Sequence, residues 1–363
     1  MKNLRKWIRL LTTPGLGIKL SLRLIESLGD PSNFVGVKSP ILKELTFISQ
    51  NIKDKLSLDI DPPNWGRIQK VMESKNIKYL TILDDDYPSL LKSIFEPPLI
   101  LFYRGNFDSE KIRRSLAVVG TRKCTFYGKE QTKKIVEGLC MSGVTIISGL
   151  ALGIDTIAHF SAVRNYGYTV AVLGSGVDYI YPPENRKLAD EILKNGILIS
   201  EFLPGSKVER WNFPRRNRII SGMSLGTLVV EGSKKSGAML TSKFALEQNR
   251  EIFALPGDIN REQAEGPNYL IKLGAKLTES SNDILEGLNI KISKDVEPAF
   301  FPELSSEEEE IYQIILKNKP AISIDNLIIN SQKLFSELST IILQLELKNI
   351  IKRLPGNKIA PLF

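Results

Sequence analysis

Six strand-length apolar runs, rich in β-branched residues, follow one another between residues 115 and 257, and helix-length segments separate them. Nearly all of the runs end in glycine. Continuous apolar strands that alternate with amphipathic helices are typical of a parallel sheet that helices cover on both faces. We therefore predict an α/β fold with a Rossmann-like, doubly wound parallel sheet over residues 115–288. The six runs are SLAVVG, VTIISG, YTVAVLG, ILISE, GTLVVEG and EIFALPG.

Residues 1–60 are predicted to form an N-terminal helical domain of a SAM-like or helix-hairpin-helix-like kind. The turn PGLG at residues 14–17 precedes Leu20, Leu24 and Leu28, which recur at helical spacing. Backbone amides that are free at the start of the second helix can hold a DNA phosphate. A small packing module without a ligand would show the same turn, so the sequence leaves both interpretations open.

Residues 61–114 are rich in proline turns and contain one apolar strand, Leu99 to Tyr103. We interpret them as a connecting segment that leads into the Rossmann-like domain. At the other end of that domain, a charged linker is expected over residues 289–303.

Residues 304–363 contain three helical patterns and a candidate hairpin, which together predict a winged-helix-like domain. Ser306 and Glu309 have the spacing of a capping box at the start of its first helix. Acidic residues are favoured at this end of a helix by its dipole, which accounts for the run of glutamates there.

Charge favours a polyanionic partner, because 49 Lys and Arg residues against 41 Asp and Glu residues give a net charge of +8. The two cysteines, Cys124 and Cys140, form no Cys/His cluster, and His159 is the one histidine. A zinc site, a disulfide framework and a Ser-His-Asp triad are therefore disfavoured. Asp155 lies four residues before His159, which predicts a pair that stabilises a helix. We expect no metal, no cofactor and no catalytic residue.

No apolar stretch approaches the roughly 20 residues that are needed to cross a bilayer. The basic and apolar N-terminus lacks the long apolar region and the cleavage site of a signal peptide. The sequence therefore predicts a cytoplasmic protein with no membrane partner.

Function is expected where the strands end, because ligands of open parallel sheets bind in the crevice beyond the carboxyl ends of the strands. Glycine and serine at these positions allow backbone amides to approach a phosphate closely. A further segment, GSKKSGAMLTS, contains a loop that leads into a helix predicted to begin near Ala238. The first N–H groups of that helix are free. The candidates at these places are Gly120, Thr121, Arg122, Ser148, Gly149, Gly174, Ser175, Gly176, Ser236, Gly237 and Thr241.

The stretch NFPRRNRIISGMS at residues 212–224 places Arg215, Arg216 and Arg218 close together, where they repel one another unless an anion or acid lies among them. We expect its first half to be a loop on the crevice rim and its apolar half to be a helix. Arginines beside Trp211 and Phe213 suit single-stranded nucleic acid, whose bases stack on aromatic rings without sequence preference.

A structural role is the alternative for these arginines. One of them would pair with an acid such as Glu201, and another would cap backbone carbonyls. We expect this of at least one of the three.

Common nucleotide-binding motifs are missing. The sequence has no G-x-x-x-x-G-K-[ST], and in GSGVDY residue Tyr179 replaces the third glycine of the dinucleotide fingerprint. We expect Asp178, Tyr179 and Tyr181 to shape this loop. Asn185 and Lys187, which follow it with Arg186, are candidates for contact with a phosphate.

Seven segments in this order resemble the bacterial DNA-processing protein A (DprA/Smf) family: VVGTR, SGLALGIDTIAH, VLGSGVDYIYPPEN, SEFLPG, FPRRNRIISGMS, LVVEGSKKSGAMLTSKFALEQNREIFALPG and GPNYLIKLGA. The resemblance implies a non-enzymatic protein that binds single-stranded DNA and dimerises through the Rossmann domain. It also implies loading of RecA recombinase during natural transformation. By this resemblance the DNA contacts include Arg122, Arg215 or Arg216, Arg218 and Lys187. Phe213 and Asn217 of the same stretch are further candidates for contact with DNA.

An enzyme is the alternative function, namely a Rossmann-like nucleotide hydrolase of the lysine-decarboxylase-like type. GMSLGTLVVEG is distantly similar to the glycine-rich signature of such enzymes, but Met223 and Ser224 interrupt the pair of glycines.

Overall fold

The computed structural model describes residues 2–37, 40–290, 304–318, 320–348 and 350–361, and its largest feature is a nine-stranded sheet. The strand order is β1-β2-β6-β5-β4-β3-β7-β8-β9. All neighbours from β6 to β9 are parallel, whereas β2 is antiparallel to both β1 and β6. The bounds are β1 (Lys78–Thr81), β2 (Ile100–Gly105), β3 (Ser115–Val119), β4 (Thr145–Ser148), β5 (Thr169–Val172), β6 (Ile197–Ser200), β7 (Gly226–Val229), β8 (Glu251–Ala254) and β9 (Lys276–Leu277).

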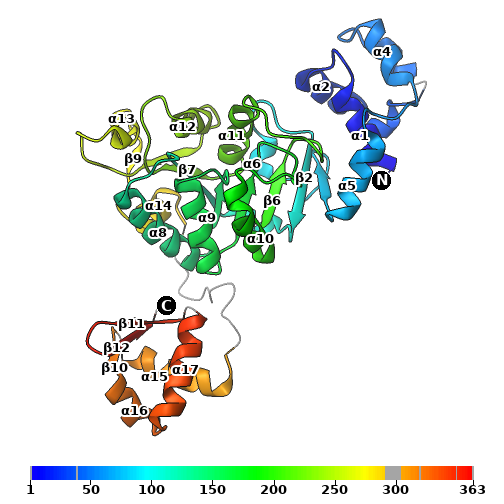
Figure 1. Ribbon diagram of the computed structural model, residues 1–363. Helices are drawn as coiled ribbons and strands as arrows, with labels where there is room; N and C mark the ends of the chain where they lie inside the picture. The colour runs from blue at the N-terminus through cyan, green and yellow to red at the C-terminus, as the bar shows by residue number, and fades with distance from the viewer. Residues whose placement is uncertain (1, 38–39, 291–303, 319, 349, 362–363) are drawn as a thin grey trace.

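Helices cover both faces of the sheet, as Figure 1 shows. Alternate residues of the central strand enter different cores: Leu116 and Val118 belong to one, and Ala117 and Val119 belong to the other. The predicted α/β class with a doubly wound parallel sheet is therefore confirmed. On one side lie α8 (Phe126–Met141), α9 (Ile154–Arg164), α10 (Arg186–Asn195) and α14 (Ser281–Gly287), and on the other α11 (Asn212–Gly222), α12 (Gly237–Glu247) and α13 (Glu265–Lys272).

The sheet begins earlier in the chain than we expected. We predicted one strand within residues 61–114, and the structure has two, β1 and β2, which extend the sheet beyond β6. The short helices α6 (Ser89–Lys92) and α7 (Ser109–Arg113) lie in the same segment. Strand β1 was not predicted because it is only four residues long and half-buried, so its apolar pattern is weak.

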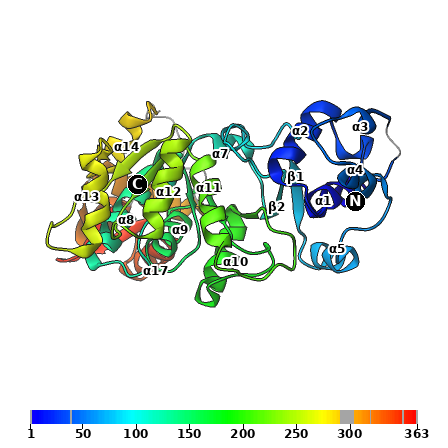
Figure 2. The same ribbon diagram turned by 90° about the horizontal axis from the view of Figure 1, so that it is seen from above.

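Five N-terminal helices pack beside β1 and β2, at the end of the sheet that Figure 2 shows near the N-terminus. The predicted glycine turn joins the first two helices, and Gly15 has a φ of 88°, which favours glycine. Trp7 and Ile8 are fully buried in a core that is continuous with β2. The helices are α1 (Lys2–Thr12), α2 (Ile18–Leu28), α3 (Pro40–Glu44), α4 (Gln50–Ser57) and α5 (Trp65–Ser74).

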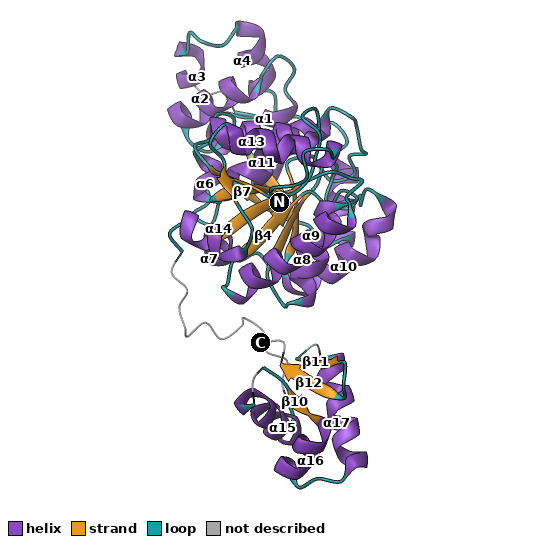
Figure 3. Ribbon diagram, turned by 90° about the vertical axis from the view of Figure 1, so that its left-hand side faces the viewer, coloured by secondary structure: helices purple, strands orange, loops and turns teal. Residues whose placement is uncertain are grey.

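The C-terminal part has three helices and a three-stranded sheet of order β10-β12-β11, with an apolar core of its own (Figure 3). This is the predicted winged-helix arrangement. The capping box was predicted one residue too late, because Ser305 and Glu308 form it. The elements are α15 (Ser306–Lys317), β10 (Ile322–Ser323), α16 (Ile324–Ser331), α17 (Phe335–Leu347), β11 (Ile351–Leu354) and β12 (Lys358–Pro361).

Candidate nucleic-acid interface

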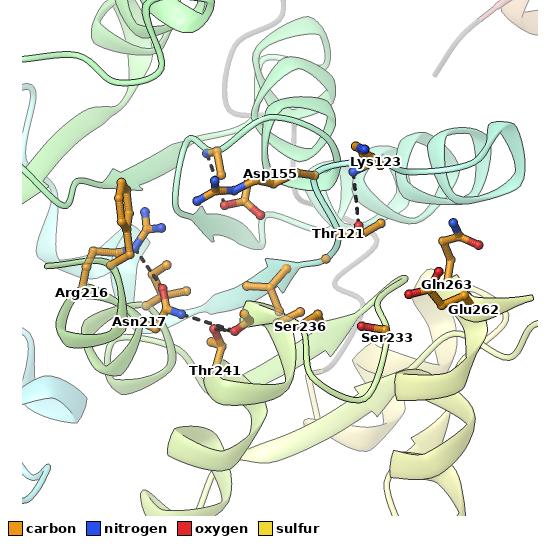
Figure 4. Close-up of a pocket in the computed structure, with 18 residues that line it drawn as sticks. Thr121, Lys123, Asp155, Arg216, Asn217, Ser233, Ser236, Thr241, Glu262 and Gln263 are labelled. Atoms are coloured by element: carbon orange, nitrogen blue, oxygen red, sulfur yellow. Dashed lines mark hydrogen bonds between the residues drawn. The ribbon is translucent and has the colours of Figure 1, made fainter. Parts of the chain in front are cut away.

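The chain changes direction across the sheet between β3 and β7, which lie next to each other. From β3 the chain builds β4, β5 and β6 on one side, and it then returns through α11 to build β7, β8 and β9 on the other. The loops that leave β3 and β7 therefore diverge, and a crevice forms at this switch point. A hollow of about 570 Å³ lies there (Figure 4).

Half of the predicted site residues line this hollow. They come from the loop after β3, from the start of α11 and from the start of α12: Gly120, Thr121, Arg122, Phe213, Arg216, Asn217, Ser236, Gly237 and Thr241. Glu262 and Gln263 line the side opposite Arg216 and Asn217 in Figure 4. The hollow thus extends from α11 to the turn that precedes α13.

Lys123, Ser233, Glu262 and Gln263 also line the hollow, and they are not among the predicted site residues. Ser233 comes four residues after β7, at a strand end where function is expected, and Lys123 follows Arg122 directly, so the same rule could have found it. Glu262 and Gln263 lie in a connection far from any strand end that we considered. No local signal in the sequence marked them.

Arg122 is exposed at the edge of the hollow. Its guanidinium lies over the ring of Phe213, 5.6 Å from the ring centroid. Within the described part of the chain, Arg122 forms no ion pair with a carboxylate. Its positive charge is therefore available to an anion at the rim.

Arg216 is buried and forms part of the floor of the hollow. Its Nη1 donates to the carbonyl oxygen of Gly149 and, over 2.6 Å, to that of Val172. A Cβ atom at Gly149 would clash with the guanidinium, which explains the glycine. Burial lowers the pKa of Arg216 to about 10, against the opposing effect of Asp155, so the side chain stays charged at neutral pH.

Arg218 and Arg215 share one carboxylate. Arg218 donates to Glu201 over 2.5 Å, and both side chains are almost fully buried. Arg215 is half exposed, 3.6 Å from the same carboxylate oxygen, and its guanidinium lies 5.5 Å from the Phe202 ring centroid. Burial raises the pKa of Glu201, although both arginines oppose that effect.

The expectation that at least one of the three arginines has a structural role is therefore confirmed. Arg216 caps carbonyls and Arg218 pairs with Glu201, which leaves Arg215 as the exposed member.

The expected loop at the start of this stretch is wrong. The whole stretch from Asn212 to Gly222 is α11, and Pro214 is its third residue. A proline is tolerated there because the first four N–H groups of a helix have no partner within the helix. Arg215 and Arg218 therefore share one side of a helix and reach Glu201, whereas Arg216 points to another side, and the three do not lie together along a loop.

Three other predicted residues are buried and use their side chains to hold loops. The Ser148 hydroxyl donates to the carbonyl oxygen of Val118 over 2.6 Å, and the Ser175 hydroxyl donates to that of Tyr179 over 2.7 Å. The Asn185 amide donates to the carbonyl oxygen of Leu150 over 2.9 Å. The structure does not bring these side chains to the hollow.

Gly174, Gly176 and Lys187 lie outside the lining of the hollow as well. Gly176 allows close packing, because a Cβ atom there would lie 2.8 Å from the carbonyl oxygen of Leu203. Lys187 is exposed at the beginning of α10.

The start of α12 offers donors to an anion. Ser236 is its N-cap residue, but the Ser236 hydroxyl makes no capping bond and is buried without a partner among the described residues. Lys234 and Lys235 are exposed just before it. Free N–H groups and the helix dipole favour an anion at such a position.

The predicted pair of Asp155 and His159 is wrong. Asp155 accepts from the Gly149 N–H over 3.1 Å, and the Nδ1 atom of His159 lies 2.8 Å from the Thr169 hydroxyl. Both side chains are buried, and burial together with the charge of Arg216 lowers the pKa of His159 to about 3. Asp155 thus helps to shape the loop that holds Arg216.

The described residues contain no cluster of three or more Cys, His, Asp and Glu side chains that could hold a metal ion. None of the helices they form has the length and apolar character that a membrane crossing requires.

Known families and structures match this chain over most of its length. The family model described as DNA recombination-mediator protein A matches residues 78–289, and the DprA winged helix domain matches residues 297–357. DNA processing protein DprA of Bacillus subtilis is 40% identical over 272 residues, which cover 74% of this chain and 90% of that protein.

Two solved structures are similar. DNA processing protein A of Streptococcus pneumoniae has a TM-score of 0.64 and 32% identity, and the match covers 78% of this chain and 95% of that one. DNA processing protein A of Helicobacter pylori, whose structure was described for its single-stranded DNA binding mode, has a TM-score of 0.52 and 29% identity. That match covers 58% of this chain and 96% of that one.

Proposed function

This chain belongs to the DNA recombination-mediator protein A family, and on that premise we propose that it binds single-stranded DNA along the crevice rim. We further propose that it acts in the cytoplasm as a homodimer, protects incoming DNA, and loads RecA recombinase onto it in natural transformation. The observation that carries the proposal is the exposed Arg122 guanidinium, without a carboxylate partner among the described residues, at the edge of an open hollow.

The phosphate groups of the strand would be held by cations and backbone donors around the hollow. Arg122 and Lys123 line one edge, and Arg215 is half exposed on α11. The start of α12 contributes the free amides beside Ser236, with Lys234 and Lys235 next to them. These groups contact a sugar–phosphate backbone without selecting a sequence.

Arg216 and Arg218 have a different part in this proposal. Their guanidiniums are buried and partnered, so they hold the end of the sheet together rather than contact DNA directly. Phe213 lies beside Arg122 and offers a ring on which a base stacks.

The DNA would leave the site chemically unchanged. Asp155, the carboxylate in the floor, accepts backbone N–H groups and balances Arg216, and His159 is buried. Both therefore have structural roles that explain their positions.

The test is the binding of fluorescent oligo-dT, measured by anisotropy at several salt concentrations. We expect Arg122→Ala to weaken binding about 10-fold to 100-fold, since it removes a hydrogen bond between charged groups. The slope of log K against log salt should become shallower by about 0.7, the value for one lost phosphate contact on a single strand. Arg113→Ala is the matched control, because Arg113 is exposed on α7, before β3 begins and so at the other end of that strand.

If Arg122→Ala binds oligo-dT as tightly as the wild type, the rim is not the DNA-binding surface. Duplex DNA, AMP and ATP serve as further probes, and turnover of either nucleotide would favour the nucleotide hydrolase instead. RecA-dependent ATP hydrolysis on single-stranded DNA, with and without this protein, tests loading. Size measurements at several protein concentrations test the dimer.

A further inference from the structure

Arg122 and Lys187 are predicted DNA contacts that the hollow alone does not connect. Arg122 lines the hollow, and Lys187 lies at the start of α10. We propose that Tyr181 lies between them as a nucleobase-stacking residue and leads the strand from the hollow to α10. This inference rests on the proposed function, and it gives Tyr181 a direct contact in place of the loop-shaping role that we expected from the sequence.

Tyr181 continues a row of groups that begins at the edge of the hollow. The Arg122 guanidinium lies 5.6 Å from the centroid of the Phe213 ring. The Phe213 ring lies 6.0 Å from the Tyr181 ring, with an angle of 46° between the ring planes. A cation followed by two aromatic rings is the alternation that single-stranded nucleic acid requires, since successive bases stack while the cation meets a phosphate.

Phe213 is held in place by the backbone beside it. A Cβ atom at Gly174 would lie 3.2 Å from Cδ1 of Phe213, so the ring packs closely over this glycine. The Asn212 amide donates to the carbonyl oxygen of Gly174 over 3.0 Å and attaches the start of α11 to the same loop. Because Gly174 and Arg122 occupy positions around Phe213, Tyr181 has the more open ring of the two.

Tyr181 is presented on an ordered support. The Ser175 hydroxyl donates to the carbonyl oxygen of Tyr179, which closes the loop that precedes it. Asn185, just after it, is buried and bonded to Leu150. Between these anchors the Tyr181 side chain is 42% exposed. A ring that is already held loses little entropy when a base stacks on it.

Two cations follow Tyr181 closely in the chain. Arg186 and Lys187 are both exposed, and neither forms an ion pair within the described residues. Glu184 is the one acid between residues 181 and 187, so this stretch has a net positive charge. A strand that stacks on Tyr181 would therefore find phosphate contacts on α10.

The test compares Tyr181→Ala with Tyr181→Phe in the full-length protein, with oligo-dT as the ligand. We expect Tyr181→Ala to weaken binding about 5-fold to 150-fold, the effect of losing one stacked base. The salt slope should not change, because tyrosine has no charge to release counterions. Tyr181→Phe should restore wild-type affinity, since it keeps the ring. Tyr179→Ala is the control, because Tyr179 is 41% exposed on the same loop and has no ring contact with Phe213 among the described residues.

A second measurement detects stacking directly. One 2-aminopurine base is placed at each position of the oligonucleotide in turn, and its fluorescence is quenched where it stacks. Among the positions quenched with the wild type, we expect one to stay quenched with Tyr181→Phe and to become bright with Tyr181→Ala. If Tyr181→Ala does not fold, Tyr181→Leu removes the aromatic face while it keeps apolar volume.

The outcomes separate this inference from the proposed function. A wild-type protein that does not bind the oligonucleotide contradicts the proposed function itself. A wild type that binds, together with a Tyr181→Ala variant of equal affinity and unchanged quenching, overturns only the role of Tyr181. A weaker Tyr181→Ala variant with a shallower salt slope also overturns it, because the residue would then be acting through phosphate contacts.

Discussion

The rim of the central sheet and the exposed face of α17 differ sharply, although winged-helix and Rossmann-like folds can both serve nucleic-acid binding. Arg122 and Lys123 are exposed at the rim, and Arg215 is exposed on α11. In contrast, α17 contains no Lys or Arg, and Leu343 and Leu347 are 51% and 73% exposed on it. A DNA-reading helix would need donors for phosphates and bases on that face.

This difference teaches that the chemistry of a surface, rather than the fold beneath it, decides what the surface binds. Affinity for nucleic acid depends on cations that displace counterions from phosphates. The rim has such cations and α17 does not. We therefore expect the single-stranded DNA affinity of this protein to reside in the sheet domain.

The two regions also differ in what lies beneath them. Charged side chains are buried beneath the rim. Arg216 and Asp155 lie below the hollow, and Arg218 pairs with Glu201. Beneath α17 the core is apolar, for example at Leu338. The loss of one side chain should therefore lower the free energy of unfolding more beneath the rim than on α17.

The largest effect is expected from Arg216→Met. The substitution leaves Asp155 without the charge that balances it and leaves the carbonyl oxygens of Gly149 and Val172 without their donor. Removal of one partner from a buried, charged group costs about 3–5 kcal/mol. Urea unfolding should show a loss of this size. Leu343→Ser on α17 is the contrasting control, and surface changes of this kind stay within about 0.5 kcal/mol. A fully stable Arg216→Met variant would contradict the scaffold role.

A smaller effect is expected at Glu308, the one buried carboxylate among the described residues of the winged-helix part. Burial by itself would raise the pKa of Glu308, but hydrogen bonds from Lys348 and from the Ser305 N–H outweigh it and lower the pKa. A carboxylate with a lowered pKa stabilises the folded state above its unfolded pKa, and that stability is lost as pH falls through the folded pKa.

Hydrogen exchange of α15 measures this effect. Glu308→Gln should reduce the protection factors of α15 by about 2-fold to 5-fold at pH 7, the range of a partly exposed ion pair. The difference from the wild type should shrink as the pH falls below the ordinary glutamate range. A difference that does not shrink at all as the pH is lowered would show that charge is not its cause.

The smallest effect tests the comparison directly. A chain that ends at residue 290 retains the whole rim and lacks α17. Since the winged-helix part has its own core, its removal should leave the sheet folded. We expect the affinity for oligo-dT to change by less than about 3-fold, since no rim cation is lost. A loss comparable with that of Arg122→Ala would break the distinction between the two regions.

Much of the fold could be predicted because it depends on local periodicity. The six apolar runs are the strands β3 to β8, and the rule that ligands bind beyond strand ends led to Arg122 and Gly120 at the hollow. The short strand β1 and the two-residue strand β9 were missed, because so few residues carry no clear pattern. The RecA, dimer and domain-boundary expectations stay predictions.

The environments of the arginines could not be predicted. In a helix each residue turns about 100° from the one before, so Arg215 and Arg218 meet the same carboxylate, whereas Arg216 meets other neighbours. Those neighbours are Gly149, Val172 and Glu201, and they come from the ends of β4, β5 and β6. Nothing within the arginine stretch itself indicates which side chain meets which strand.

The sequence by itself determined the class of the fold, the edge of the sheet where ligands bind and the family to which the chain belongs. These follow from apolar periodicity and from residues that stand next to one another in the chain. Only the tertiary structure decided which arginine is buried and which is exposed, and that Tyr181 lies against Phe213. The physical reason is that burial and partnership depend on segments distant in sequence, which meet only when the sheet has formed.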